Sequence, residues 1–256
     1  MSVGSLILRA PAGQRTLLKL VRSICPACLC GEKVVVDGVR LEVDLARFPD
    51  WDYANGHTDK EEMAFLVDNC PDNGIVLDVG ANIGIYSIYV ATHRPGARVL
   101  AFEPVPEIVE RFKRNIALNN VHNIVVCDYA LAEEETTKEL MLNVTTNTGG
   151  NSFVVNQTQF QGFEKKIPVK TKTMLQALQE NKVERVDVLK ADVEGYEYPI
   201  LKKFFADAPK SLWPRTMVLE AFGSTIPRVG GSTVELVIAS GYHLINHNNM
   251  NFFFKL

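Results

Sequence analysis

The chain carries little excess charge of either sign and has no long hydrophobic run. Its 256 residues have a formal net charge of -3, with acidic and basic residues interspersed. This composition offers no basic surface of the kind that binds nucleic acid. No apolar run approaches the ~20 residues that a membrane-spanning helix needs, and the first residues lack the basic start and apolar centre of a signal peptide. We therefore expect a cytoplasmic protein with no transmembrane segment and no nucleic-acid partner.

Cysteine is scarce, and its number argues against a disulfide framework. The chain has 5 cysteines, an odd number, which favours a reducing compartment. Cys25, Cys28 and Cys30 stand close together, but structural zinc needs four ligands, usually from two such pairs. A redox C-x-x-C normally opens a helix, whereas this one follows an expected helix. We therefore predict buried or incidental thiols here.

The length suits one α/β domain with an N-terminal extension over residues 1–70. In the extension we expect an amphipathic helix over 14–25 and a β-hairpin over 33–43 that turns at Asp37-Gly38. The aromatic, irregular stretch 47–58 either covers an active site or is a packed connector. A further helix is expected over 59–69.

From residue 71 to 256, short apolar runs alternate with helical patterns, as in a parallel sheet covered by helices. An insertion over 133–170 interrupts the alternation. Its ends read as antiparallel strands, and its Asn- and Gly-rich middle is either a lid over a substrate or a surface loop. The expected strands are 75–77, 98–102, 123–131, 138–144, 166–172, 186–191, 217–221, 242–247 and 251–256; the expected helices are 85–92, 106–119, 174–180, 196–205 and 232–240.

The most informative stretch is the turn Asp78–Gly84, which follows the first core strand. Its glycines permit unusual backbone angles and let a ligand approach the main chain. The helix that follows presents unpaired N–H groups at its N-terminus. Glu103 ends the neighbouring strand, at the edge where a doubly wound sheet holds a ribose diol.

The spacing of this turn indicates which nucleotide-like cofactor it binds. A dinucleotide fingerprint reads G-x-G-x-x-G, whereas this turn reads D-x-G-x-N-x-G. A compact turn with an acidic residue before its first glycine suits S-adenosylmethionine, which has no pyrophosphate to wrap. Asp128 falls near a strand end beside the expected adenine, where it is either an acceptor for the N6 amine or an ordinary strand-end aspartate. The expected cofactor-binding residues are Asp78, Gly80, Ala81, Asn82, Gly84, Glu103, Pro104, Asp128, Tyr129 and Ala130.

Three blocks of sequence together resemble the FkbM-type family of S-adenosylmethionine-dependent methyltransferases. They are Val76–Gly84, Ala101–Pro104 with Arg114–Asn119, and Leu189–Glu197. The resemblance covers roughly residues 55 to 222. It implies a class I, Rossmann-like methyltransferase sheet, mostly parallel with an antiparallel last strand. Upstream of these blocks, the chain departs from the family pattern: it has Gly56-His57-Thr58-Asp59, where the family commonly has a glycine followed shortly by Tyr-Glu.

Charged residues follow two of the later strands, at the edge where such a sheet binds ligands. Lys190, Asp192 and Glu194 alternate and are expected on one side, and Glu220 ends the next strand. They form either a salt-bridge cluster or a catalytic site. In the catalytic reading, Asp192 takes a proton or orients substrate, with Glu194 and Glu220 in support. Mg²⁺ held by these carboxylates is a further possibility, but we assign no metal ligand.

The resemblance therefore implies an O-methyltransferase that acts on a hydroxyl of a sugar, a glycan or a small natural product. One alternative is a protein that binds S-adenosylmethionine without turnover, although three carboxylates at the catalytic corner argue against it. The other is a methyltransferase acting on RNA or protein, for which the mild acidity is unhelpful. The oligomeric state cannot be read from the sequence.

Overall fold

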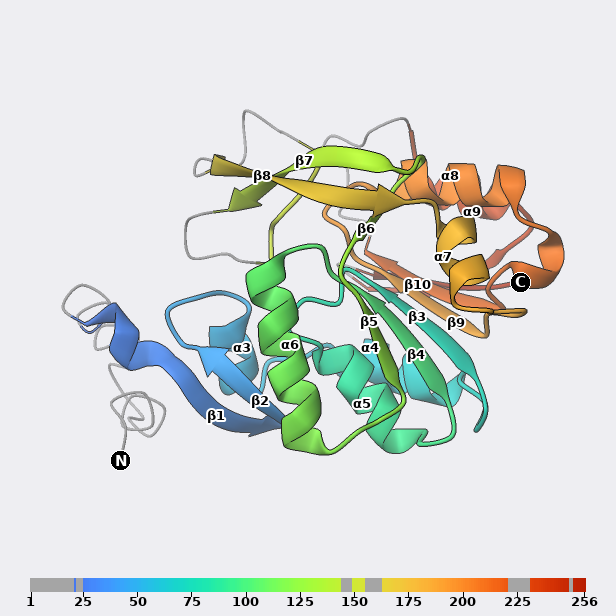
Figure 1. Cartoon of the computed structure of the whole chain (residues 1–256). Coiled ribbons are helices and arrows are strands. Elements are labelled where there is room, and N and C mark those ends of the chain that lie inside the picture. The colour runs from blue at the N-terminus through green and yellow to red at the C-terminus, as the bar shows by residue number, and fades with distance from the viewer. Residues whose placement is uncertain (1–20, 22–24, 144–148, 155–162, 221–230, 249–250) are drawn as a thin grey trace.

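The computed structural model describes residues 21, 25–143, 149–154, 163–220, 231–248 and 251–256. At its centre is a seven-stranded sheet with the order β11-β12-β10-β9-β3-β4-β5 (Figure 1). All adjacent pairs from β10 to β5 are parallel, and β12 runs antiparallel to both of its neighbours. This confirms the expected class I arrangement with an antiparallel last strand. The strands are β3 (Ile75–Val79), β4 (Arg98–Phe102), β5 (Ile124–Cys127), β9 (Val188–Ala191), β10 (Thr216–Glu220), β11 (His243–His247) and β12 (Asn251–Lys255).

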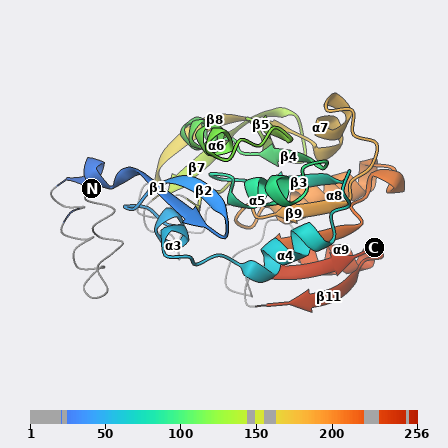
Figure 2. The same cartoon turned by 90° about the horizontal axis from the view of Figure 1, so that it is seen from below.

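Helices cover both faces of this sheet (Figures 1 and 2). The strands are mostly apolar because both of their faces are buried: β3 and β4 are buried at four of their five positions. One face carries α4 (Lys60–Asp68), α5 (Ile85–His93) and α6 (Pro106–Asn119); the other carries α7 (Met174–Glu180), α8 (Glu197–Asp207) and α9 (Thr233–Ala239). Within the described residues, no helix is both long enough and apolar enough to cross a membrane.

Local sequence signals place the ends of these helices. The side chain of Asp59 caps α4 by accepting a hydrogen bond from the backbone N–H of Glu62. A capping box between Thr173 and Gln176 starts α7. Asn120, in a left-handed conformation, ends α6. The six helices of these two layers begin and end within two residues of the expected bounds.

The β-hairpin of the N-terminal region packs on α6. It consists of β1 (Cys30–Val36) and β2 (Val39–Asp44), and positive φ angles at Asp37 and Gly38 match the expected type I′ turn. The amide of Asn115 on α6 accepts from the backbone N–H of Glu42 at 2.7 Å. The stretch 47–58, expected to be irregular, contains the short helix α3 (Asp50–Ala54). The boundary at residue 70 stays a prediction, since α4 lies in the same helical layer as α5.

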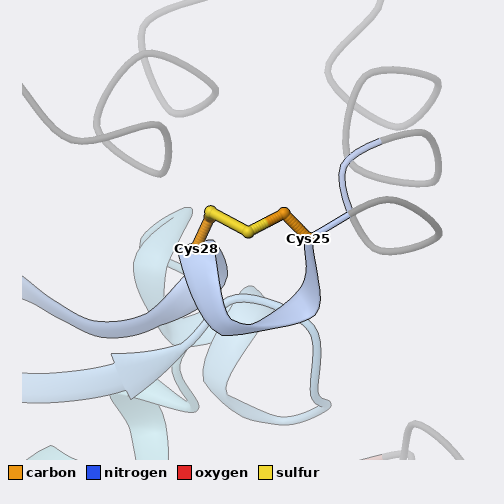
Figure 3. The surroundings of a disulfide bond; sticks show 2 residues. All are labelled: Cys25 and Cys28. Atoms are coloured by element: carbon orange, nitrogen blue, oxygen red, sulfur yellow. A yellow bond between two sulfur atoms is a disulfide. The ribbon is translucent and has the colours of Figure 1, made fainter.

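The prediction of thiols at the cysteine cluster is wrong for two of its three members. Cys25 and Cys28 form a disulfide (Figure 3). Between them the 3-10 turn η1 (Pro26–Leu29) brings their Cα atoms to 5.5 Å, within the range that a disulfide spans. An odd total of cysteines does not forbid a single local pair. Of the helix expected over 14–25, only Val21 and Cys25 lie within the described residues.

A second, three-stranded sheet with the order β6-β8-β7 contains the strands at both ends of the expected insertion. Its strands are β6 (Ala130–Leu131), β7 (Thr136–Asn143) and β8 (Phe163–Lys172), and the expected antiparallel pair is β7 with β8. The single strand expected over 123–131 is divided, because the chain leaves the central sheet after Cys127 and β6 joins the second sheet. Of the expected loop, residues 149–154 are described, and Ser152 forms a β-bridge with Met141. The rest of the loop lies outside the described residues.

Candidate active site

A cavity of about 830 Å³ opens at the carboxyl ends of the central strands. This volume is within the usual range for a small-molecule site, and the edge is where open α/β sheets bind ligands. The turn after β3 and the residue after β4 line one part of it. Asp192 after β9 and Glu220 at the end of β10 line another, and residues of the N-terminal region and of the insertion complete the wall.

The turn after β3 is held against the ends of both neighbouring strands. Gly80 has a φ of 84°, and a Cβ atom added there would lie 1.9 Å from the carbonyl oxygen of Asp192. The backbone N–H groups of Gly80 and Ala81 both donate to the carbonyl of Phe102. Only glycine fits this conformation and this close approach, because any Cβ would overlap the backbone of Asp192. The predicted cofactor turn and the predicted catalytic aspartate are therefore in direct contact.

Gly84 has a different role from Gly80. It does not line the cavity, and a Cβ atom added to it would lie 1.9 Å from the ring of Phe112 on α6. With a φ of 87°, it lets the turn pass directly into α5 under that ring. Gly84 thus supports the packing of α5 on α6.

Glu103 lines the cavity and is fixed by backbone donors. Its carboxylate accepts from the N–H of Asn82 at 3.1 Å and from the N–H of Val105 at 3.0 Å. Burial raises the pKa of Glu103 to about 7, although these two hydrogen bonds act in the opposite direction. The side-chain oxygen of Asn82 is buried without a hydrogen-bond partner among the described residues. A fixed carboxylate, an open amide oxygen and a close main-chain turn fit a ligand with a ribose diol, and Pro104 continues the wall.

Asp78 lies beneath the cavity and does not line it. It is 2% exposed, accepts from the hydroxyl of Ser87 at 2.6 Å and lies 3.8 Å from the ammonium of Lys190. Burial raises its pKa, while Lys190 and the bond from Ser87 lower it. Asp78 therefore connects β3, α5 and β9 under the turn.

Of the three expected cofactor-binding residues Asp128, Tyr129 and Ala130, only Ala130 lines the cavity. Asp128 is exposed, and the Tyr129 ring packs edge-on against Phe102 with 5.8 Å between ring centroids. The reason is the departure of the chain from the central sheet after Cys127, which the strand expected over 123–131 did not include. Cofactor binding by Asp128 and Tyr129 stays a prediction.

Asp192, Glu194 and Glu220 come together in the cavity. One carboxylate oxygen from each lies within 4.8 Å of the others. The expected alternation along one strand does not produce this arrangement, because β9 ends at Ala191 and Glu194 has a positive φ of 54° in the turn that follows. The turn directs Glu194 toward the end of β10. One oxygen of Glu220 is buried and has no hydrogen-bond partner within the described chain.

Lys190 lies below this group and faces three carboxylates. Its ammonium is 3.5 Å from Asp192, 3.8 Å from Asp78 and 3.9 Å from Glu62. Burial opposes the charge of Lys190, but the three carboxylates raise its pKa above the ordinary value. The ring of Tyr86 also covers the ammonium at 4.9 Å. The salt-bridge interpretation is therefore confirmed for Asp192 with Lys190, and the catalytic role of the three carboxylates stays a prediction.

The sequence analysis missed Glu62 and Glu197. Glu62 on α4 is 5% exposed and pairs with Lys190, which lies 128 positions later in the sequence. The sequence showed only that Glu62 would lie in the first turn of an expected helix. Glu197 is 3% exposed and accepts from the N–H groups of Val193 and Gly195 at 2.9 and 3.4 Å. It therefore fixes the turn that carries Asp192 and Glu194. Its place in the block Leu189–Glu197 was the available signal.

The three clustered carboxyls have unequal affinities for a proton. Burial alone would raise the pKa of Asp192, but the nearby Lys190 lowers it below the ordinary value. Burial, reinforced by Asp192, raises the pKa of Glu194 to about 8 and that of Glu220 well above its ordinary value. At neutral pH the site therefore holds an ionised Asp192 beside two carboxyls with strongly raised pKa values. This arrangement can accept a proton from a substrate and pass it on.

The insertion contacts the same turn. The hydroxyl of Ser152 donates to the carbonyl of Glu194 at 2.9 Å. The ring of Phe153 lies 5.1 Å from that of Tyr196, measured between centroids, and both rings line the cavity. The segment 149–154 therefore forms a wall beside the acidic group.

The family model for the methyltransferase FkbM domain matches residues 78–236, which is more than half of the chain. The chain belongs to this family. The matched range contains the turn after β3, Glu103 and the three clustered carboxylates. Strands β4, β5, β9 and β10, with the turn after β3, therefore belong to an FkbM methyltransferase domain.

Curated relatives match over part of the chain. Methyltransferase sdnD of Sordaria araneosa is 31% identical over 168 residues, which cover 55% of this chain and 64% of that protein. Hexuronic acid methyltransferase AglP of Haloferax volcanii is 26% identical over 157 residues, 59% of each chain. The 31-O-demethyl-FK506 methyltransferase FkbM of Streptomyces tacrolimicus is 25% identical over 194 residues, 67% of this chain and 73% of that one. The chain thus spans less than two thirds of sdnD and AglP.

Among solved structures, precorrin-6y C5,15-methyltransferase from Geobacter metallireducens aligns over 77% of this chain and 88% of its own. The TM-score is 0.45 at 14% identity.

Proposed function

We propose that this FkbM domain is an S-adenosylmethionine-dependent O-methyltransferase whose acceptor is a hydroxyl of a sugar, a glycan or a small natural product. The observation that carries the proposal is the contact between Gly80 and Asp192. This contact places the turn that suits the cofactor beside the carboxylates that suit a hydroxyl acceptor. Both groups line one cavity. The names of the relatives AglP and FkbM, which specify a hexuronic acid and 31-O-demethyl-FK506, support an acceptor of this kind.

In this proposal the cofactor is held by the turn Gly80–Asn82 and by Glu103 with Pro104. When bound, the cofactor would supply an electrophilic methyl group on its sulfonium sulfur. The sulfur would lose this methyl group to the acceptor and become a neutral thioether. Asp192 accepts the hydroxyl proton as the oxygen attacks, and Lys190 keeps Asp192 ionised for that step. Glu194 and Glu220 orient the acceptor, and the walls around the cavity exclude water.

The first experiment tests the cofactor. Isothermal titration calorimetry with S-adenosylhomocysteine and with NAD separates the two ligand classes. We expect S-adenosylhomocysteine to bind, and Glu103→Ala to weaken its affinity by about tenfold or more, since a charged hydrogen bond contributes roughly 1.5–3 kcal/mol. Glu110→Gln, on the exposed side of α6, is the matched control. Tight binding of NAD would contradict the proposal.

The second experiment tests the reaction. Transfer of a radiolabelled methyl group is measured with pooled glycans, small hydroxylated metabolites, RNA and protein as separate acceptors. We expect label in the glycan or metabolite pool. Label only in RNA or protein would favour the macromolecular alternative. Cofactor binding with no labelled product in any pool would favour a non-catalytic protein.

A further inference from the structure

The part of the cavity beside Asp192 has two walls of different chemistry. One wall consists of the carboxylates of Asp192, Glu194 and Glu220. The other is apolar and comes from the insertion and from the start of α8, with the rings of Phe153 and Tyr196 and the side chain of Leu140. A ligand that fills this space must present hydrogen-bond donors to one side and an apolar surface to the other.

The carboxylate wall is short of positive charge. Lys190 is the ion-pair partner of Asp192, and it is already shared with Glu62 and Asp78. Within the part of the chain that the structure describes, neither Glu194 nor Glu220 forms an ion pair. Such a wall accepts hydrogen bonds from hydroxyl groups, and the unpartnered oxygen of Glu220 is open to one. A further carboxylate is disfavoured, because it would lie beside the ionised Asp192, and the raised pKa values of Glu194 and Glu220 show that added negative charge is already costly here.

The aromatic wall is fixed in place. Tyr196 is 7% exposed, and its hydroxyl donates to Glu133 at 2.7 Å and accepts from Lys138 at 3.1 Å. Phe153 is held beside it because its neighbour Ser152 is bonded to the carbonyl of Glu194. The negative faces of aromatic rings attract the C–H groups that make one face of a sugar ring apolar.

We infer that the acceptor is an uncharged sugar ring, which stacks its C–H face on the aromatic wall and directs its hydroxyls to the three carboxylates, and that hexuronates are disfavoured. This inference rests on the proposed methyl transfer and names its substrate class. It separates this chain from AglP, whose name specifies a hexuronic acid. The distinction comes from charge and ring contacts within this cavity.

The test compares aryl hexosides with the matching hexuronides in the gluco, galacto and manno configurations, each with labelled S-adenosylmethionine. We expect kcat/KM for the best hexoside to exceed that of its hexuronide by at least about tenfold, the scale of a modest charge penalty. Equal or better use of the hexuronides would overturn the inference.

A variant tests the aromatic wall. Phe153→Leu keeps a buried apolar side chain but removes the ring face, so KM for the hexoside should rise about fivefold or more with little change in kcat. Phe153→Tyr should restore KM. Tyr198→Ala, whose ring does not line the cavity, is the control and should leave KM unchanged. An unchanged KM in Phe153→Leu would contradict the stacking.

Calorimetry with S-adenosylhomocysteine keeps the two proposals apart. If the cofactor product binds but no hexoside is methylated, the sugar inference fails and the cofactor site stands. If the cofactor product does not bind, the proposed function itself fails.

Discussion

At the scale of single residues, Lys190 organises the site. It is 2% exposed, and its ammonium faces Glu62 of α4, Asp78 of β3 and Asp192 in the turn after β9. A buried ammonium is costly without partners, and buried carboxylates are equally costly, so each makes the other tolerable. The result is one carboxylate, Asp192, that is both ionised and 38% exposed to the cavity.

Asp192→Asn is the residue-scale test of catalysis. We expect turnover to fall by roughly a hundredfold or more, the usual scale for loss of a general base. Affinity for S-adenosylhomocysteine should change little, because the turn Gly80–Asn82 and Glu103 remain. Loss of activity on chelation and its recovery with Mg²⁺ would show that the three carboxylates act as metal ligands. A variant with the wild-type rate would move the role of base to Glu194.

At the scale of elements, the turn after β3 determines how closely two strand ends approach. Gly80→Ala should destabilise the protein and abolish binding of S-adenosylhomocysteine, because its Cβ would overlap the backbone of Asp192. Gly38→Ala is the matched control: it has the same φ of 84° but nothing within 4 Å of its Cβ, so it isolates the conformational cost of about 1–2 kcal/mol. Urea unfolding and calorimetry measure the two effects. Equal losses of stability in both variants would contradict the contact.

A buried ion pair connects α3 to α6. The carboxylate of Asp50, 0% exposed, pairs with Arg111 and accepts from the backbone N–H of Asp44 at 2.7 Å. Burial raises the pKa of Asp50, and Arg111 acts against this rise. Because α3 carries Asp52 and Tyr53 into the cavity wall, this pair positions part of that wall.

Removing Arg111 tests this connection. Arg111→Ala should lower the free energy of unfolding by about 3–5 kcal/mol, since it leaves a buried carboxylate without its partner. Lys113→Ala, which breaks an exposed pair with Glu110 on the same helix, should change the stability very little. Urea denaturation of the two variants measures the difference. Similar losses in both would mean that Asp50 finds another partner.

At the scale of the whole molecule, the concentration of buried carboxyls makes stability depend on pH. Burial raises the pKa of Glu62, Glu103 and Glu197 to about 7 and that of Glu194 to about 8, from 4.5. At pH values between the ordinary pKa of 4.5 and these raised values, the folded protein binds more protons than the unfolded chain. Its stability is therefore greatest at the acidic end of this range and falls as pH rises through the folded-state pKa values.

We accordingly expect the free energy of unfolding of the ligand-free protein to decrease between about pH 5 and about pH 8, by at most about 1.4 kcal/mol per pKa unit for each group. Urea unfolding at constant ionic strength measures it. Glu103→Gln should show a smaller decrease, because one titrating carboxyl is gone. Stability that stays constant or rises over this range would contradict the prediction.

Much of the fold could be predicted from the sequence because its signals are local. Strands β3 and β4 are mostly apolar runs, and α6 begins with proline and ends at an asparagine with positive φ. These features act within a few residues, so they can be read without knowing what packs against them. Local signals and the family resemblance together predicted three further features. They are the turn Asp78–Gly84, the position of Glu103 and the antiparallel last strand.

What the sequence could not show depends on contacts between distant segments. Three features depend on how elements pack, and no local pattern encodes that packing. They are the pairing of Glu62 with Lys190, the contact of the Phe112 ring with Gly84, and the exposure of Asp128. The disulfide was missed because the geometry of η1, and not the number of cysteines, brings Cys25 and Cys28 together. The sequence by itself determined the elements and the chemistry at the ends of the strands. Only the tertiary structure decided which side chains meet, because burial and charge act through space between residues far apart in the chain.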